Sequence, residues 1–311
     1  MRRFSRVMAP VAALTLVLSA CATETGDTTT TTAPLITSSV PTTSTTQPAT
    51  TTTTQAPTTT TTIPAETGAV VYYLLEEVEN DSGGPFLVPV YRESSSSDDP
   101  ARQVVDLLLQ GPSEDETAGL PAISTAIPQD TESLGVSVDD GVATVDLSAE
   151  FDDGGGSFSM FARLAQVVYT LTRIEGVDQV EFEIEGEPVT VFSSEGIALD
   201  GPQERADHYD LLPPIFVDTP AWGEPVTSPV HIGGLSNVFE AVSQVMLTDD
   251  DGLTLFEATV LATCGTGCWG EWEIDIPYTV DRDQFGALIV WEYSAEDGSR
   301  IHVREYPVQL R

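Results

Sequence analysis

The stretch LGVSVDDGVATVDLSAEF, residues 134–151, decides the fold of the first half of the chain. Apolar and polar residues alternate on both sides of Asp139-Asp140-Gly141, a combination that favours a tight hairpin turn. We therefore predict two strands, over residues 134–138 and 142–147, joined by this turn. Neither this acidic turn nor the one at residues 248–252 has the ligand spacing of an EF-hand loop, so we interpret both as turns rather than calcium sites.

Two helices flank this hairpin in the sequence. In DDPARQVVDLLLQGP, residues 98–112, Asp99 is a natural N-cap, Pro100 fits the first helical position, and Gly111-Pro112 ends the helix. The second helix is predicted to be capped at Ser157 and to end before Gly176. The apolar faces have helical spacing: Ala101, Val104, Val105, Leu108 and Leu109 in the first helix, and Phe161, Leu164, Ala165, Val168 and Leu171 in the second.

Further strands complete this half. VVYYLL at residues 70–75 and FLVPVY at 86–91 are predicted strands joined by a turn at residues 80–84. VEFEIEG at residues 180–186 alternates strictly, with Val180, Phe182 and Ile184 on one face. The predicted order is ββα-ββα-β, which gives a small α/β layer over residues 70–205.

Residues 213–311 have a different pattern, and a boundary is expected near residues 204–214. About seven short alternating runs without a helix predict an all-β sandwich of immunoglobulin type. In EWEIDIPY, residues 271–278, we expect Trp272, Ile274 and Ile276 to face inward. ALIVWEYS, residues 287–294, places Ala287, Ile289, Trp291 and Tyr293 on one face, and Trp272 and Trp291 are core candidates. In RIHVREYPVQL, residues 300–310, Ile301 and Val303 are predicted to be buried. The fold class is therefore α+β.

The N-terminus has the features of an exported, lipidated protein. Three arginines precede an apolar run in residues 1–20, which is typical of a signal peptide. Leu18-Ser19-Ala20-Cys21 resembles a bacterial lipobox, so we predict that Cys21 carries fatty acyl chains and anchors the protein at the extracytoplasmic face of the cell membrane. Residues 21–69 are rich in Thr and Pro and poor in large apolar residues, which predicts a disordered tether.

Charge and cysteine content limit the partners, metals and cofactors that we expect. Without its signal the chain has nine arginines, no lysine and 49 acidic residues, a formal charge of −40. Such a surface repels phosphate groups, so nucleic acid is excluded as a partner. Cys264 and Cys268, in TCGTGCW, favour a disulfide if the chain is outside the cell, whereas metal or redox roles would be considered in the cytosol. A zinc site would need further ligands and the chain has three histidines, so we predict neither a metal nor a cofactor.

No catalytic residue is predicted. Asp146, Glu150, Asp152 and Asp153 lie close in sequence, but a glycosidase needs two acids about 5–10 Å apart across a cleft, and nothing singles out a pair among 49 acids. The histidines belong to no nucleophile–base motif. The hypothesis of a polysaccharide hydrolase that uses a carboxylate pair remains as an alternative.

Three motifs carry a resemblance: LLLQGP (107–112), TAIPQDTESLGVSVDDGVATVDLSAEF (125–151) and VVYTLTRIEGVDQVEFEIEGEPV (167–189). Together they resemble the GerMN domain of sporulation and germination proteins, which also occurs in actinobacterial lipoproteins. IFVDTPAWGEPVTSPVHIGGLSNVFEAVSQVMLTDDDG (215–252) and CGTGCWGEWEIDIPY (264–278) resemble the immunoglobulin-like domain that accompanies GerMN.

The resemblance implies a non-catalytic, adhesive or scaffolding role in the cell envelope. The expected partners are the membrane, through the lipid, and envelope proteins or cell-wall glycan. A role as accessory modulator of a membrane sensor kinase is the other alternative.

Overall fold

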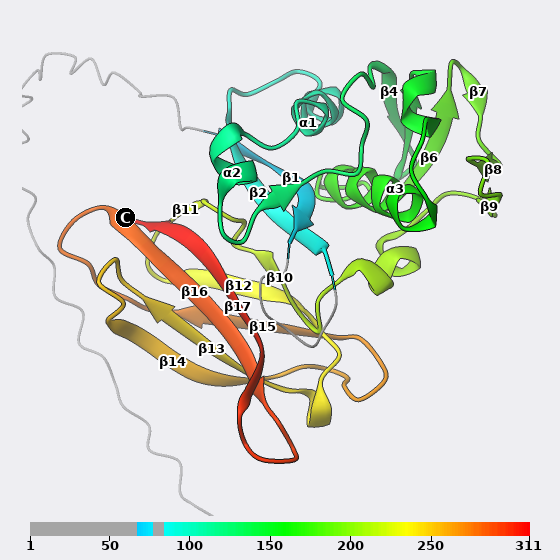
Figure 1. Cartoon of the computed structure of the whole chain (residues 1–311). Helices are drawn as coiled ribbons and strands as arrows, with labels where there is room; N and C mark the ends of the chain where they lie inside the picture. Colours follow the sequence, from blue (N-terminus) through cyan, green and yellow to red (C-terminus); the bar gives the residue numbers. More distant parts are fainter. Residues whose placement is uncertain (1–66, 77–83) are drawn as a thin grey trace, which may run out of the picture. The chain divides into compact units, whose positions relative to one another are not determined.

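The structure, a computed structural model, describes residues 67–76 and 84–311 (Figure 1). The described chain has a mixed α/β half followed by an all-β half, so the predicted α+β class is confirmed. The signal peptide, Cys21, nearly all of the tether and most of the turn at residues 80–84 lie outside the described residues, and these interpretations stay predictions.

The first sheet is built around the strand that follows the tether. Strand β1 (Thr67–Leu75) pairs antiparallel with β2 (Phe86–Ser94) along its whole length, and with the short β3 (Ile123–Ser124) on its other edge. Both longer strands were predicted, and both extend beyond the predicted bounds. The core-facing side chains of β1 include Val71, Tyr73 and Leu75.

The second sheet has the order β4-β5-β6-β7. Strands β4 (Ser133–Asp139) and β5 (Val142–Leu147) form the predicted hairpin, and Asp140 and Gly141 have φ values of 48° and 84° as its turn requires. Strand β6 (Gln179–Ile184) runs parallel to β5, and β7 (Glu187–Pro188) closes the edge. The single layer expected from the element order is therefore divided, because β1 pairs with β2 and β3 instead of with this hairpin. A two-stranded sheet of β8 (Val191–Phe192) and β9 (Ile197–Ala198) follows.

Helix α1 (Pro100–Leu109) has the predicted start. The side chain of Asp99 accepts a hydrogen bond of 3.0 Å from the backbone N–H of Arg102. Its predicted apolar face is buried apart from Leu109, which is half-buried. The helix packs against β1, β4 and α3 (Ser157–Leu171), as Figure 1 helps to follow. A short helix that was not predicted, α2 (Glu114–Ala118), begins with a capping box formed by Ser113 and Glu116.

Helix α3 differs from the prediction at its start and on one face. Gly156 is the N-cap, and Ser157 is already helical, with its hydroxyl donating to Oε2 of Glu195 at 2.7 Å. Phe161, predicted to be buried, is 44% exposed. The buried face instead includes Arg163 and Gln166, whose side chains bond to backbone atoms of β1 and of the loops around the helix. Apolar periodicity alone cannot locate a buried face that contains polar residues.

The second half is a two-layered sandwich, as predicted. Its three-stranded sheet has the order β10-β12-β15, and its five-stranded sheet has the order β11-β17-β16-β13-β14, so eight strands replace the seven expected. Figure 1 shows β13, β14, β16 and β17 side by side. The strands are β10 (Ile215–Thr219), β11 (Pro225–Val226), β12 (Val230–Ser236), β13 (Val242–Thr248), β14 (Thr254–Leu261), β15 (Gly270–Ile276), β16 (Gln284–Tyr293) and β17 (Arg300–Leu310).

The prediction for β17 is wrong, because Val303 is 50% exposed and Ile301 is half-buried. The pairing of β16 with β17 shifts between Val290 and Glu292, and His302 has a φ of 52°. A one-residue bulge exchanges the two faces of a strand. The inward side chains are therefore those of Arg304, Tyr306, Val308 and Leu310.

The two tryptophans predicted in the core are both buried, but in different places. Trp272 belongs to the main hydrophobic cluster between the sheets. Trp291 lies on the opposite face of β16 from Leu288 and Val290, and the guanidinium of Arg300 lies 4.2 Å from its ring centroid. Trp291 is thus covered by a cationic side chain on the outside of the sheet.

Candidate functional site

A charged cluster joins the two halves of the described chain at Asp218, near the end of β10. Oδ2 of Asp218 accepts hydrogen bonds of 2.9 Å from Nη1 of Arg173 and from Nη1 of Arg205, and Oδ1 accepts one from the hydroxyl of Tyr72. Tyr72 belongs to β1, Arg173 to the turn after α3, and Arg205 to the 3-10 helix η2 (Arg205–Leu211) in the linker. One carboxylate therefore holds three separate segments together.

Burial and charge determine the protonation of this cluster. Burial acts to raise the pKa of Asp218, but Arg205 and Arg173 outweigh it and hold that pKa below its usual range. Burial, together with the charge of Asp218, raises the pKa of Tyr72, so its phenol stays neutral and donates a proton to the hydrogen bond. The cluster has no proton to exchange near neutral pH and is suited to holding the two halves together rather than to acid–base chemistry.

Aromatic rings pack beside the Asp218 cluster, and the rings and the cluster together form the junction between the two halves. The ring of Tyr169 in α3 lies 5.3 Å from that of Tyr72 and 6.0 Å, edge-on, from that of Phe216 in β10. The guanidinium of Arg205 lies 4.7 Å from the Tyr169 centroid. These rings form a second hydrophobic cluster with residues from both halves of the chain. Trp222 adds a backbone link, because its N–H donates to the carbonyl of Pro89 in β2 at 2.8 Å.

Beside this cluster a cavity of about 360 Å³ opens on the outer face of the sheet β10-β12-β15. Its lining includes Arg205 and Asp218 from the cluster and Glu271 and Glu273 from β15. Gly233 is paired with Glu273 and adjoins the end of β10, so no side chain separates Asp218 from Glu273 on this face. The cavity is therefore bordered on one side by the hydrogen-bonded cluster of Asp218 and on the other by the carboxylates of Glu271 and Glu273.

Gly234, the neighbour of Gly233, has a different structural role. A Cβ on Gly234 would overlap the backbone carbonyl of Phe216, because β10 and β12 approach closely next to the irregular pairing between Val217 and Thr219. At Gly233 the nearest atom to such a Cβ would be 3.4 Å away. Gly234 thus allows β10 to lie close to β12, and Gly233 leaves the cavity open.

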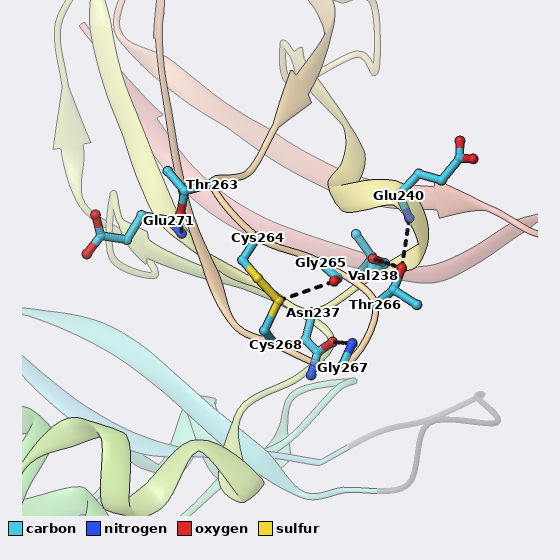
Figure 2. The surroundings of a disulfide bond; sticks show 10 residues. All are labelled: Asn237, Val238, Glu240, Thr263, Cys264, Gly265, Thr266, Gly267, Cys268 and Glu271. Atoms are coloured by element: carbon cyan, nitrogen blue, oxygen red, sulfur yellow. Dashed lines mark hydrogen bonds between the residues drawn. A yellow bond between two sulfur atoms is a disulfide. The ribbon is translucent and has the colours of Figure 1, made fainter.

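A disulfide loop lies between β14 and β15 (Figure 2). Cys264 and Cys268 are bonded, with their Cα atoms 5.9 Å apart, and the N–H of Gly267 donates to Oδ1 of Asn237 at 2.8 Å. Trp269 follows the loop directly, and its ring lies 5.5 Å from the ring of Tyr209, which lines the cavity. The loop therefore positions an aromatic side chain next to the cavity.

Removing this disulfide, with serine at both Cys264 and Cys268, is expected to lower the free energy of unfolding by about 2 kcal/mol, the chain-entropy value for so short a loop. Denaturant titration followed by tryptophan emission measures the loss, and the change next to Trp269 should also shift the emission of the folded state. Wild type titrated in the presence of a thiol reductant is the second measurement and should match the double variant, since both lack the bridge. An unchanged midpoint for the double variant would contradict this expectation.

His208 is a buried residue of the linker helix η2, and neither ring nitrogen has a hydrogen-bond partner among the described residues. Burial lowers its pKa from 6.5 to about 4, against a smaller opposing effect of Asp207. The neutral imidazole therefore belongs to the folded state, and protonation favours unfolding.

Stability is accordingly expected to fall as the pH decreases from 6.5 towards 4. Above pH 6.5 neither state is protonated at His208; below it the unfolded chain binds a proton that the folded chain does not accept until about pH 4. The loss attributable to this residue reaches roughly 3 kcal/mol at the lower pH. Because carboxylates titrate in the same range, the quantity to measure is the difference in unfolding free energy between wild type and His208→Leu at pH 7.5 and pH 4. If the difference in unfolding free energy between wild type and His208→Leu is the same at pH 7.5 and pH 4, His208 does not cause the loss of stability.

The other residues considered in the sequence have local roles. Oδ1 of Asp146 accepts a hydrogen bond of 2.9 Å from the N–H of Gly186, and a hydrogen bond from the Ser148 hydroxyl lowers the pKa of Glu150. The acidic turn at residues 248–252 is confirmed as a turn, with Oδ1 of Asp249 accepting from the N–H of Leu253 at 2.8 Å. Across residues 67–76 and 84–311, no group of three or more His, Cys, Asp or Glu side chains is placed to hold a metal.

The junction was missed by sequence reasoning. Tyr72 and Asp218 are 146 residues apart, and no local pattern links either of them to Arg173 or Arg205. None of the described helices is long and apolar enough to cross a membrane.

Comparison with known proteins gave two family matches and several solved structures. The family described as sporulation and spore germination matches residues 70–190, and the immunoglobulin-like domain of bacterial spore germination matches residues 214–299. No curated protein matches. The first GerMN domain of GerM from Bacillus subtilis is 20% identical, with a TM-score of 0.37, over 45% of this chain and 99% of its own.

Two further solved structures are similar. The tandem GerMN domains of the same Bacillus subtilis protein are 17% identical over 69% of this chain and 62% of theirs, with a TM-score of 0.38. A candidate lipoprotein from Clostridium perfringens is 19% identical over 46% of this chain and 93% of its own, with a TM-score of 0.32.

Proposed function

Since this chain is a GerMN domain of the sporulation and spore germination family followed by a spore-germination immunoglobulin-like domain, we propose that it is a non-catalytic scaffold of the cell envelope. The observation that supports this most directly is the junction, where Asp218 binds Arg173, Arg205 and Tyr72. Two binding domains fixed to each other present one continuous surface, which is what a docking protein needs. Neither family description names a reaction.

The location is part of the proposal. Acyl chains on Cys21 would hold the protein at the extracytoplasmic face of the membrane, and the Thr-rich tether would separate the folded unit from the lipid by about 35–40 Å as a flexible coil. The disulfide between Cys264 and Cys268 supports an oxidising compartment. The formal charge of −40 favours distance from anionic lipid headgroups, which is consistent with a long tether.

Crosslinking of the full chain in its native cells tests the proposal. Envelope proteins or wall glycan should be recovered with the protein, and mass spectrometry should find diacylglycerol on Cys21 and an acylated N-terminus. In the Cys21→Ser control the protein should leave the membrane fraction and its crosslinks should decline. An unmodified thiol on a cytosolic protein would overturn the proposal, and recovery of a membrane kinase alone would favour the sensor accessory instead.

A further inference from the structure

We propose that the cavity between the linker and the outer face of β12 and β15 binds uncharged carbohydrate, specifically N-acetylated sugar units of an envelope glycan. The inference rests on the proposed envelope function and assigns one of its binding sites. Four observations carry it: the cavity itself, its unpaired hydrogen-bond acceptors, the aromatic pair at its side, and the excess of carboxylates in its lining.

The cavity has the dimensions of a small-ligand site. Its volume of about 360 Å³ lies near the lower end of ligand pockets, which span about 300–1,000 Å³. The glycine at position 233 keeps its centre free of side chains, and the pairing of Gly233 with Glu273 and of Leu235 with Glu271 brings both carboxylates to the same face. A sugar unit fits such a space better than a folded partner does.

The free polar groups of the cavity include two carboxylate acceptors. Glu271 and Glu273 are exposed, and no other described residue donates a hydrogen bond to either carboxylate or forms an ion pair with it. Sugar hydroxyls and acetamido N–H groups are donors, and hydrogen bonds to a charged acceptor are the stronger kind. The carboxylates therefore complement an N-acetylated glycan.

Tyr209, which lines the cavity, and Trp269, which packs against it, supply the apolar part of the site. The rings of Tyr209 and Trp269 lie 5.5 Å apart with an interplanar angle of 50°, and both are half-buried, so each still exposes surface. Such amphipathic rings offer an apolar face and a polar edge. The C–H face of a pyranose ring has the matching character.

Charge argues against the other ligand classes. The guanidinium of Arg205 is bound by Asp218, and the ring of His231 lies 2.9 Å from a carboxylate oxygen of Asp275. The lining has three carboxylates, those of Asp218, Glu271 and Glu273, against the one guanidinium of Arg205, so the cavity repels a phosphate or carboxylate polymer. A lysine-rich peptide would be attracted to Glu271 and Glu273, but the aromatic pair favours sugar, and the experiment separates these two partners.

The test is a titration of the full chain with the β-1,4-linked tetramer of N-acetylglucosamine, followed by tryptophan emission. Saturable quenching is expected, and Glu273→Gln should weaken binding about tenfold or more because a charged acceptor is lost. Glu257→Gln is the matched control, an exposed glutamate on β14 of the other sheet, and should bind like wild type. Circular dichroism verifies that both variants are folded.

The outcomes are distinct from those of the crosslinking experiment. Absence of binding to the tetramer, or equal affinity of Glu273→Gln and wild type, overturns the carbohydrate site while leaving the scaffold intact. Binding of a lysine-rich peptide in place of the tetramer, weakened by salt, also overturns it. Specific binding of the tetramer that Glu273→Gln weakens supports the site even if no envelope partner is crosslinked, and reducing ends released from the tetramer would refute the non-catalytic proposal.

Discussion

Asp218→Asn is expected to lower the free energy of unfolding by about 3 kcal/mol and to separate the unfolding of the two halves. The side chains of Asp218, Arg173 and Arg205 are 21%, 28% and 24% exposed, so the ion cluster is largely shielded from water. Removing one partner of a buried pair leaves the remaining charges uncompensated, at a cost of about 3–5 kcal/mol, and partial exposure places this case at the lower end.

The chain provides separate probes for the two halves. All four tryptophans, at positions 222, 269, 272 and 291, lie in the second half, whereas helices α1 and α3 lie in the first. Tryptophan emission and far-ultraviolet circular dichroism should therefore give one coincident transition for wild type and two for the variant.

The matched control for this variant is Asp275→Asn. Asp275 is 72% exposed and pairs with His231 on the same sheet, so its loss should change stability by less than about 1 kcal/mol. Coincident transitions in Asp218→Asn, or a loss as small as that of Asp275→Asn, would show that Asp218 does not couple the halves.

Tyr169→Ala is expected to have a comparable effect, about 3–5 kcal/mol, through packing rather than charge. Its ring is fully buried between Tyr72 and Phe216, and the guanidinium of Arg205 packs on it. The truncation leaves a cavity at the boundary of the two halves, and the two-probe denaturant titration described above measures the loss.

Tyr169→Phe isolates the contribution of the hydroxyl, which donates to the backbone carbonyl of Arg205 at 3.2 Å. We expect this variant to lose about 1 kcal/mol, the usual net value of one hydrogen bond. If alanine and phenylalanine at position 169 had equal effects, the hydrogen bond and not the ring would hold the junction.

Local signals predicted much of this fold. Helix α1 begins and ends where Asp99, Pro100 and Gly111 indicate, because capping and termination depend on neighbouring residues. The hairpin at Asp140-Gly141 was predicted for the same reason. Strand β15 follows its alternation, with Trp272 and Ile276 buried and Glu271 and Glu273 exposed.

Non-local effects explain what the sequence could not predict. The inward face of β17 changes at a bulge around His302, and alternation alone does not reveal where a bulge occurs. Phe161 was assigned to the wrong face because the buried side of α3 accommodates Arg163, whose guanidinium donates to the carbonyl of Phe151 at 2.7 Å. The cluster at Asp218 depends on contacts between segments far apart in sequence, which a single sequence does not display.

The position of β17 has a consequence for biosynthesis. This strand follows all other strands of the sandwich in chain order, yet it lies between β11 and β16 and contributes Tyr306, Val308 and Leu310 to the core. A polypeptide that emerges N-terminus first, from a ribosome or an export channel, can form the α/β half early but cannot close the sandwich until residue 310 has appeared. Until then, the edge of β16 remains open, and this is the interval in which a chaperone would be most useful.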